Sequence, residues 1–270
     1  MIAKVLTDNT ACDGLLGEWG LSIHIEYKGH QYLLDTGETD LFLQNARKMN
    51  IPIEDVDYGV LSHAHYDHSD GMPAFFEANQ KAPFLLRDEA KHKCYDRSAE
   101  TPRYIGIKEG ILENYRDRIV YLHHDAELNP GVHLIGHHTA GLEAQGQYAS
   151  MYVRGGKVWK PDAFTHEQSL VFETDGGLVV FSSCSHAGAD TILREVMARF
   201  PGREIRAMIG GLHLYIRTPE EVRALAQRMR EIGIRKIITG HCTGDAALAV
   251  LRGELGDTVE TLHCGKTIEF

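Results

Sequence analysis

The chain has 270 residues, 43% of them apolar and 24% charged, so it can bury one sizeable hydrophobic core, and we expect a single domain over residues 1–270. Its 28 basic and 38 acidic side chains give a formal net charge of -10, which disfavours proteins held to nucleic acid or to anionic membranes by nonspecific attraction. The opening MIAKVLTDNTACDG lacks the basic and apolar regions of a signal peptide, and no apolar run reaches the roughly 18 residues of a membrane span, so we expect a cytoplasmic protein.

Alternating or β-rich apolar runs predict strands, and helical spacing of apolar residues predicts helices between some of them. In chain order, we expect strands at residues 21–27 and 30–37, a helix at about 39–49, a strand at 56–63, no clear pattern at 81–131, a strand at 177–183, a helix at about 190–200, a strand at 206–214, a helix at 218–233 and a strand at 235–241. In the clearest helix, Thr218 and Glu221 can form a capping box at the N-terminus, and Gly233 can end the helix as its C-terminal cap. The mixture predicts an α/β fold.

A concentration of metal-capable side chains lies in LSHAHYDHSDG, residues 61–71, where a predicted strand ends. His63 and His65 are separated by one residue, so one metal ion can take both imidazoles. Asp67 and His68 follow directly and can bind a second ion beside the first. Imidazole and carboxylate ligands suit Zn²⁺, Mn²⁺ or Fe²⁺. The segment therefore predicts half of a dinuclear metal site, and a solvated histidine-rich turn is the simpler alternative.

Two further histidines follow predicted buried strands, His186 in FSSCSHAGAD and His241 in ITGHCTGD. Active groups of layered α/β folds collect in loops at one edge of a sheet, so these histidines can meet the first cluster in one cleft. Taken alone, each is as consistent with a hydrogen-bonded structural role. Their occurrence together with HAHYDH favours a shared metal site.

HAHYDH resembles the HxHxDH signature of the metallo-β-lactamase superfamily, and the preceding LLDTG resembles the strand and turn that support it. With DGLLGEWGLSIHIEY, EQSLVFETDGGLVVFSSCSHAG, IGGLHL and GHCTGDAA, these segments resemble the branch labelled dihydropteroate-synthase-like or dihydropterin-synthase-like metallo-hydrolases. They occur in order between residues 13 and 247, so the likeness extends over most of the chain.

This resemblance implies a four-layer αβ/βα sandwich, in which two mixed sheets face each other, helices lie outside and metals lie in the cleft between sheet edges. It implies a metal-binding set of His63 and His65 at the first ion, Asp67, His68 and His241 at the second, and His186 as a further ligand. Asp35, in LLDTG, would support the metal loop. Two divalent ions are expected, with zinc as the first choice and manganese or iron as alternatives.

The chain departs from the superfamily pattern at two places. Many members have a bridging aspartate after the strand at 177–183, whereas this chain has SSCSH with Cys184 at about that position. Cys184 can be a metal ligand, a reactive thiol or a buried packing residue. Another usual ligand lies in a GHT segment, where IGHHTAG offers His138, or His137, as a ligand or as a supporting or surface residue. The five cysteines include no CxxC pair and are expected to be reduced thiols.

The favoured interpretation is a dinuclear metal-dependent hydrolase or lyase acting on a small anionic molecule, such as a phosphoester of the pterin or nucleotide type. Asp67 would bind metal and orient the attacking water, and His213 in GGLHLY is a candidate contact to the substrate, with core packing as its alternative. Two rival interpretations are a non-catalytic module that binds a ligand through its metals and a di-iron redox enzyme. The redox relatives usually carry HxExD, whereas this chain has HAHYD.

Overall fold

The computed structural model describes residues 1–12 and 14–270. A first seven-stranded sheet has the order β18-β1-β2-β3-β4-β5-β8. Its strands are β1 (Ile2–Thr7), β2 (Ser22–Tyr27), β3 (His30–Leu34), β4 (Tyr58–Val60), β5 (Phe84–Arg87), β8 (Ile119–Leu122) and β18 (Thr267–Glu269). A second seven-stranded sheet has the order β17-β16-β15-β14-β13-β10-β9. Its strands are β9 (Ala126–Asn129), β10 (Val132–Gly136), β13 (Gln168–Thr174), β14 (Gly177–Phe181), β15 (Ile205–Ile209), β16 (Lys236–Thr239) and β17 (Val259–Thr261).

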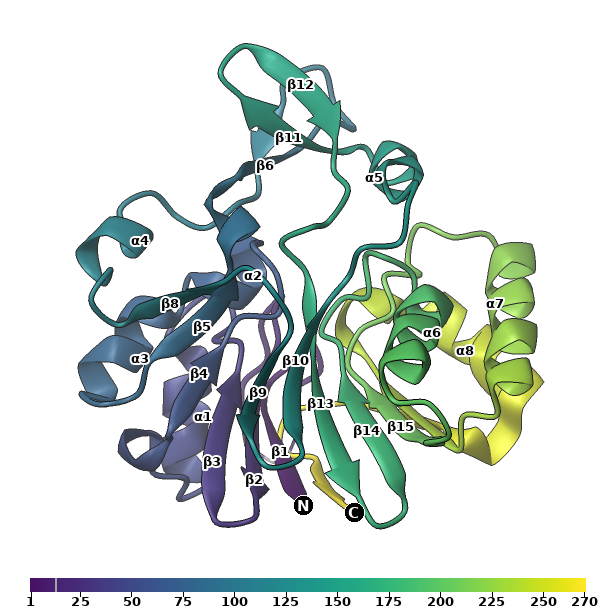
Figure 1. Ribbon diagram of the computed structural model, residues 1–270, viewed down its shortest axis with the longest axis horizontal. Coiled ribbons are helices and arrows are strands. Elements are labelled where there is room, and N and C mark those ends of the chain that lie inside the picture. The colour runs from purple at the N-terminus through teal and green to yellow at the C-terminus, as the bar shows by residue number, and fades with distance from the viewer. Residues whose placement is uncertain (13) are drawn as a thin grey trace.

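Helices cover the outer faces of both sheets (Figure 1). The helices are α1 (Leu41–Lys48), α2 (Tyr66–Ser69), α3 (Met72–Ala78), α4 (Ile111–Asn114), α5 (Glu143–Tyr148), α6 (Ala189–Arg199), α7 (Pro219–Ile232) and α8 (Asp245–Leu255), of which α1, α3, α6, α7 and α8 pack on the two sheets. One apolar cluster joins the facing sides of the two sheets, for example through Ile23 and Phe181. A second cluster joins the second sheet to α6, α7 and α8, and a third joins the first sheet to α1 and α3. The predicted four-layer arrangement of the metallo-β-lactamase fold is confirmed.

Helix α7 has the predicted capping box, in which the Glu221 amide donates to Thr218 and the Thr218 amide donates to the Glu221 carboxylate. The predicted strands at 30–37, 206–214 and 235–241 were too long at their carboxyl ends. Asp35, His213 and His241 there adopt positive φ values of 59°, 48° and 45°. A left-handed residue cannot continue a strand. The strands end at Leu34, Ile209 and Thr239, and the residues that follow, including the three left-handed ones, form the segments that carry the candidate site.

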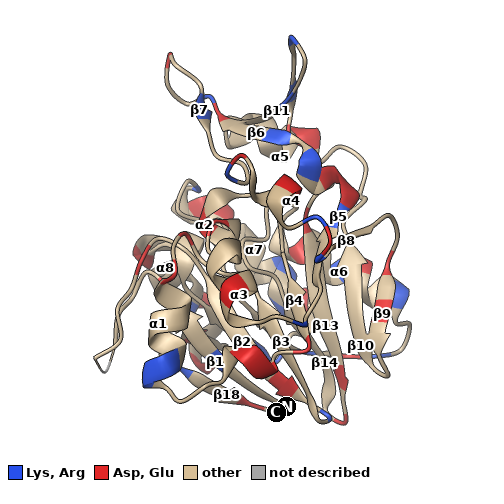
Figure 2. Ribbon diagram, turned by 90° about the vertical axis from the view of Figure 1, so that its left-hand side faces the viewer, with Lys and Arg blue, Asp and Glu red and all other residues tan. Residues whose placement is uncertain are grey.

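A four-stranded lobe projects beyond the ends of the two large sheets, as both ribbon views show (Figures 1 and 2). It contains β6 (Lys93–Asp96), β7 (Arg103–Tyr104), β11 (Met151–Gly155) and β12 (Val158–Pro161), in the order β12-β11-β6-β7. Two of its strands come from the stretch at 81–131 that showed no clear sequence pattern. None of the helices in the described part of the chain is long and apolar enough to cross a membrane.

Candidate metal centre

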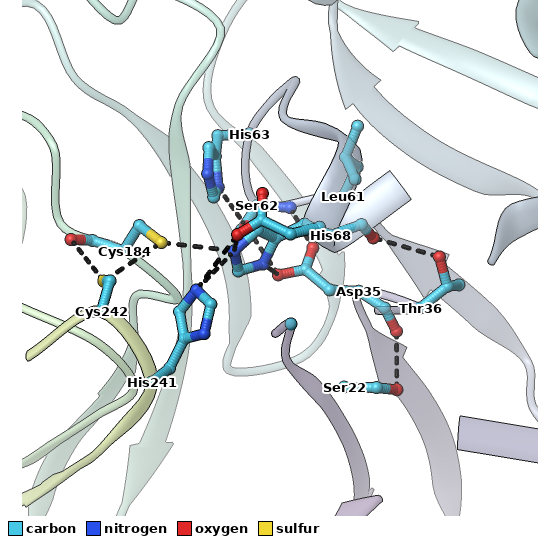
Figure 3. Close-up of polar contacts among 12 residues, drawn as sticks. Ser22, Asp35, Thr36, Leu61, Ser62, His63, His68, Cys184, His241 and Cys242 are labelled. Atoms are coloured by element: carbon cyan, nitrogen blue, oxygen red, sulfur yellow. Dashed lines mark hydrogen bonds and ion pairs between the residues drawn. The ribbon is translucent and has the colours of Figure 1, made fainter. Parts of the chain in front are cut away.

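The HAHYDH segment runs from the loop after β4 into α2, which begins at Tyr66, and Asp35 at the neighbouring strand end fixes its conformation. The Asp35 carboxylate accepts hydrogen bonds from the amide and the hydroxyl of Ser62, both at 2.7 Å, and from Nδ1 of His68 at 2.8 Å. Because the Ser62 proton points to Asp35, His63 Nδ1 donates to the Ser62 oxygen at 2.8 Å. In both rings Nδ1 is thus engaged in a hydrogen bond, which leaves Nε2 as the nitrogen that can face an ion (Figure 3).

A first group of ligands consists of His63, His65 and His186, whose ring centres lie 4.6 to 4.8 Å apart. The Nε2 atoms of His63 and His65 and both ring nitrogens of His186 are buried without a hydrogen-bond partner. Leaving such atoms unpaired is costly, and a bound cation would satisfy them. Burial lowers the pKa of all three rings, to about 3 for His65. Neutral imidazoles are the form that a metal requires.

A second group consists of Asp67, His68 and His241, brought together from sequence positions up to 174 residues apart. His241 Nε2 lies 3.4 Å from the Asp67 carboxylate and 3.2 Å from His68 Nε2. Burial raises the pKa of Asp67, but His68 and His241 outweigh that effect and hold it below its ordinary value. Within each of the two groups all the ligand atoms lie within 4.8 Å of one another. This mixed nitrogen and oxygen set fits a divalent ion, and the first group fits another.

The loop of His241 is held by Asp8 and Asn9, which follow β1. The His241 amide donates to Asp8 at 3.0 Å, and His241 Nδ1 donates to the Asn9 side-chain oxygen at 2.9 Å. Nε2 consequently faces Asp67 and His68. Sequence reasoning missed both residues, because a DN pair after a strand has the composition of any turn.

The segment 162–168, which leads into β13, contacts the metal loops of both halves, and we call it the brace. Glu167 is buried, and its two oxygens accept the amides of His186 and Ala187, both at 2.8 Å. Gln168 donates its backbone amide to the Ser62 carbonyl and its side-chain nitrogen to the Leu61 carbonyl, again at 2.8 Å. The brace therefore links the two ligand-bearing loops, and sequence reasoning missed it. The only signal was a pair of polar residues, HE, directly before a buried strand.

His166 in the brace belongs to a further buried group with His65, Cys94 and Asp162. The Ala64 amide donates to His166 Nδ1 at 3.1 Å, so that nitrogen carries no proton. Nε2 then carries a proton and donates to Asp162 at 3.1 Å. A protonated nitrogen cannot bind metal, so this geometry favours a hydrogen-bonded support for the loop over an additional ion site.

The remaining candidates from the sequence lie in different surroundings. His138 is exposed and belongs to none of the metal-capable groups in the described part of the chain, because its loop turns outward and its amide binds Glu195. Its neighbour His137 is buried but bonded to Glu195 and Ser169. Cys184 is buried, and its sulfur lies 3.3 Å from His68 Nε2. Burial raises the pKa of its thiol.

A cavity of about 270 Å³ opens onto the two ligand groups. His213 lines it, with both ring nitrogens buried and unpaired and its ring centre 4.3 Å from that of His186. Its other lining residues are Trp19, His65, Tyr66, Asp67, Arg103, Ile105, Met151, Cys184, His186, Tyr215 and Cys242. Arg103 and Met151 come from the lobe, so the lobe forms one wall of the space above the metals.

Comparison with known proteins agrees with this geometry. Residues 20–241 match the family described as the metallo-beta-lactamase superfamily. A Methanocaldococcus jannaschii protein named 7,8-dihydropterin-6-methyl-4-(beta-D-ribofuranosyl)-aminobenzene-5'-phosphate synthase is 28% identical, over 93% of this chain and 90% of its own length. An uncharacterized protein of the same organism is 27% identical over 98% of both chains. The crystal structure of Tm1679, a metal-dependent hydrolase of the beta-lactamase superfamily, superposes with a TM-score of 0.86 at 28% identity, over 100% of this chain and 99% of that one. The chain belongs to the metallo-beta-lactamase superfamily.

Proposed function

We propose that the protein is a dinuclear metal-dependent enzyme that uses an activated water to cleave a small anionic substrate. The observation that carries this proposal is the convergence of two buried ligand groups on one cavity, with the ligand nitrogens of the first group unpaired. Structural histidines are normally hydrogen-bonded at both nitrogens when buried. The pairing of Asp35 with His68 and of Ser62 with His63 leaves Nε2 of each ring available for an ion.

Two divalent ions held in these groups would lower the pKa of a water between them and polarise an oxygen of the substrate. The residues of the chain orient the water and fix the positions of the ligands. Asp67 supplies a carboxylate oxygen beside His68 and His241, where it can orient a water through a hydrogen bond. The brace and Asp35 fix the ligand geometry before substrate arrives, which avoids reorganisation during the reaction.

The cavity lining supports an anionic substrate with a planar ring. Arg103 contributes a guanidinium group to the lining, and Trp19 and Tyr215 present exposed aromatic faces at the cavity. Guanidinium groups bind phosphate and carboxylate, and aromatic side chains stack on flat ring systems. The Methanocaldococcus relative is named for a product that contains a dihydropterin and a ribofuranosyl phosphate, which agrees with such a substrate.

That relative is named a synthase, so a second candidate is an enzyme that joins two such compounds at the same metal centre. The non-catalytic binding module and the di-iron redox enzyme remain rivals. Metal analysis of freshly purified protein, followed by turnover assays with phosphodiesters, lactones and thioesters, separates these proposals. Two colourless ions with hydrolysis support the first. Product formation only with two co-substrates supports the synthase. Iron with a redox change supports the di-iron redox enzyme, and ligand binding without any turnover supports the binding module.

The test variant is His63→Ala, which removes a candidate metal ligand. Its matched control is His137→Ala, which removes a buried histidine outside both ligand groups. Activity lost in His63→Ala and kept in His137→Ala assigns the turnover to this centre. Equal activity in the two variants would contradict the proposal.

A further inference from the structure

Two buried thiols meet at the edge of the second ligand group. Cys184 follows β14 and Cys242 follows His241, and their sulfur atoms lie 3.3 Å apart. Both residues line the metal cavity. Gly211 makes this approach possible, because a Cβ atom at that position would lie 2.5 Å from the Cys242 sulfur. The fold therefore admits a second thiol beside Cys184.

We propose that Cys242 and Cys184 add two thiolates to the ligands of the second metal ion, beside His241; the inference rests on the metal centre of the proposed function. The ligand atoms of Cys184, His241 and Cys242 lie within 4.8 Å of one another. Cys184 also groups with His63 and His68, so its sulfur lies between the two ion positions.

The distances suit a common ion. With zinc–sulfur bonds of about 2.3 Å and zinc–nitrogen bonds of about 2.0 Å, ligand atoms around a tetrahedral ion are separated by roughly 3.3 to 3.8 Å. The Cys184 sulfur is 3.3 Å from His68 Nε2 and 3.3 Å from the Cys242 sulfur, and His68 Nε2 is 3.2 Å from His241 Nε2. These three separations lie at or just below the lower end of that range.

The surroundings of Cys242 differ from those of a cysteine that only packs. The His213 amide donates to the Cys242 sulfur at 3.3 Å, a contact that supports a metal-bound thiolate. Cys264, which is equally buried, is instead bonded to the backbone of Asp8 and Leu16 and does not line the cavity. Cys242 also has backbone contacts, with the His213 amide and the Cys184 carbonyl, but in addition its sulfur contacts the Cys184 sulfur and lines the cavity.

Sulfur ligands would make the second site selective for thiophilic ions. Thiolates favour zinc and cadmium over manganese and magnesium, which prefer oxygen ligands. The inference therefore assigns zinc, or another soft divalent ion, to the second site. Manganese would fill the first group of histidines more readily than the second.

The test titrates the reduced, metal-free full-length chain with Cd²⁺ and follows the near-ultraviolet absorption that arises only from cadmium–thiolate bonds. We expect this absorption in the unmodified chain, about half of it in Cys242→Ser or Cys184→Ser, and none in the double variant. Cys12→Ser is the control, because Cys12 belongs to none of the metal-capable groups in the described residues. X-ray absorption of the zinc-loaded chain should show sulfur at about 2.3 Å, and Cys242→Ser should weaken zinc binding at the second site by at least about 10-fold.

Unchanged cadmium absorption in Cys242→Ser would overturn the assignment of Cys242, and zinc spectra with only nitrogen and oxygen neighbours would overturn the sulfur site. Circular dichroism of each metal-free variant, with Cys242→Ala as a second substitution, separates ligand loss from unfolding. His63→Ala should lose the first ion and keep the cadmium–thiolate absorption. A chain that binds two ions without sulfur refutes only this inference, whereas a chain that binds no ion refutes the proposed function.

Discussion

Glu167→Gln tests whether the brace positions the metal centre. In the native chain both Glu167 oxygens accept backbone amides, those of His186 and Ala187. Glutamine keeps the shape but offers one oxygen and one NH₂ group, so one amide would face another donor. An unsatisfied buried donor costs about 1–3 kcal/mol, and the remaining hydrogen bond loses its charge. Burial raises the pKa of Glu167, which indicates a desolvation cost that glutamine avoids. We therefore expect a net loss of about 2 kcal/mol.

Urea unfolding of the metal-free chain measures this loss. With an m value of about 3 kcal/mol/M, the midpoint should fall by about 0.7 M. The displaced amide belongs to the loop of His186, so zinc affinity at the first ligand group should also fall, by about 10- to 100-fold, as when partners of metal ligands are removed. Isothermal titration of zinc into both proteins gives this second quantity.

Glu195→Gln is the matched control. Glu195 also accepts two backbone amides, those of His138 and Thr139, but it is part of neither ligand group. The Glu195→Gln variant should lower the free energy of unfolding without changing zinc affinity. If Glu167→Gln binds zinc as tightly as the native chain, or if both variants weaken zinc equally, the brace does not position the metal.

Three other outcomes are expected. His63→Ala or His65→Ala should lower the metal content measured by elemental analysis and leave the circular dichroism nearly native, whereas unchanged content in both would refute the site. Asp35→Asn should weaken zinc at the second ion by about 10- to 100-fold, because His68 loses the charged partner that orients it; calorimetric titration of zinc decides this. Burial lowers the pKa of His241, but Cys242 and Asp67 outweigh burial and raise it to about 9 in the metal-free chain. His241 should therefore stabilise the metal-free chain fully below about pH 6.5 and lose that contribution as the pH rises through about 9, while zinc affinity rises over the same window. A urea midpoint that does not fall, or a zinc affinity that does not rise, between about pH 6.5 and 9 would contradict this assignment.

Local signals in the sequence predicted the α/β mixture and the HAHYDH cluster, and the family resemblance of its motifs implied the four-layer fold and the assignment of ligands to two ions. HAHYDH places four chemically suited side chains within six residues, and the capping box of α7 depends only on neighbours in sequence. His186 and His241 required the additional expectation that strand ends meet at one edge. The HAHYDH cluster and the capping box are strong signals because the spacing of residues close in sequence determines them.

The residues that the sequence did not reveal act through backbone contacts over long separations. Glu167 binds amides 19 and 20 residues away, and Asp8 binds the His241 amide 233 residues away. A carboxylate that accepts amides has no partner side chain whose type or spacing identifies it. The end of the strand predicted at 30–37 was misplaced because the alternation of apolar residues does not reveal the left-handed conformation of Asp35.

The lobe separates the means of recognising a substrate from the means of holding the metals. Its strands contribute Arg103 and Met151 to the cavity, whereas the residues of the two ligand groups lie in the loops and short helices that follow strands of the two large sheets. Substrate preference can therefore diverge through substitutions in residues 93–104 and 151–161 while the metal chemistry is inherited unchanged. For engineering, a lobe exchanged between relatives should transfer preference, provided that the graft ends before Asp162, where the support of both ligand-bearing loops begins.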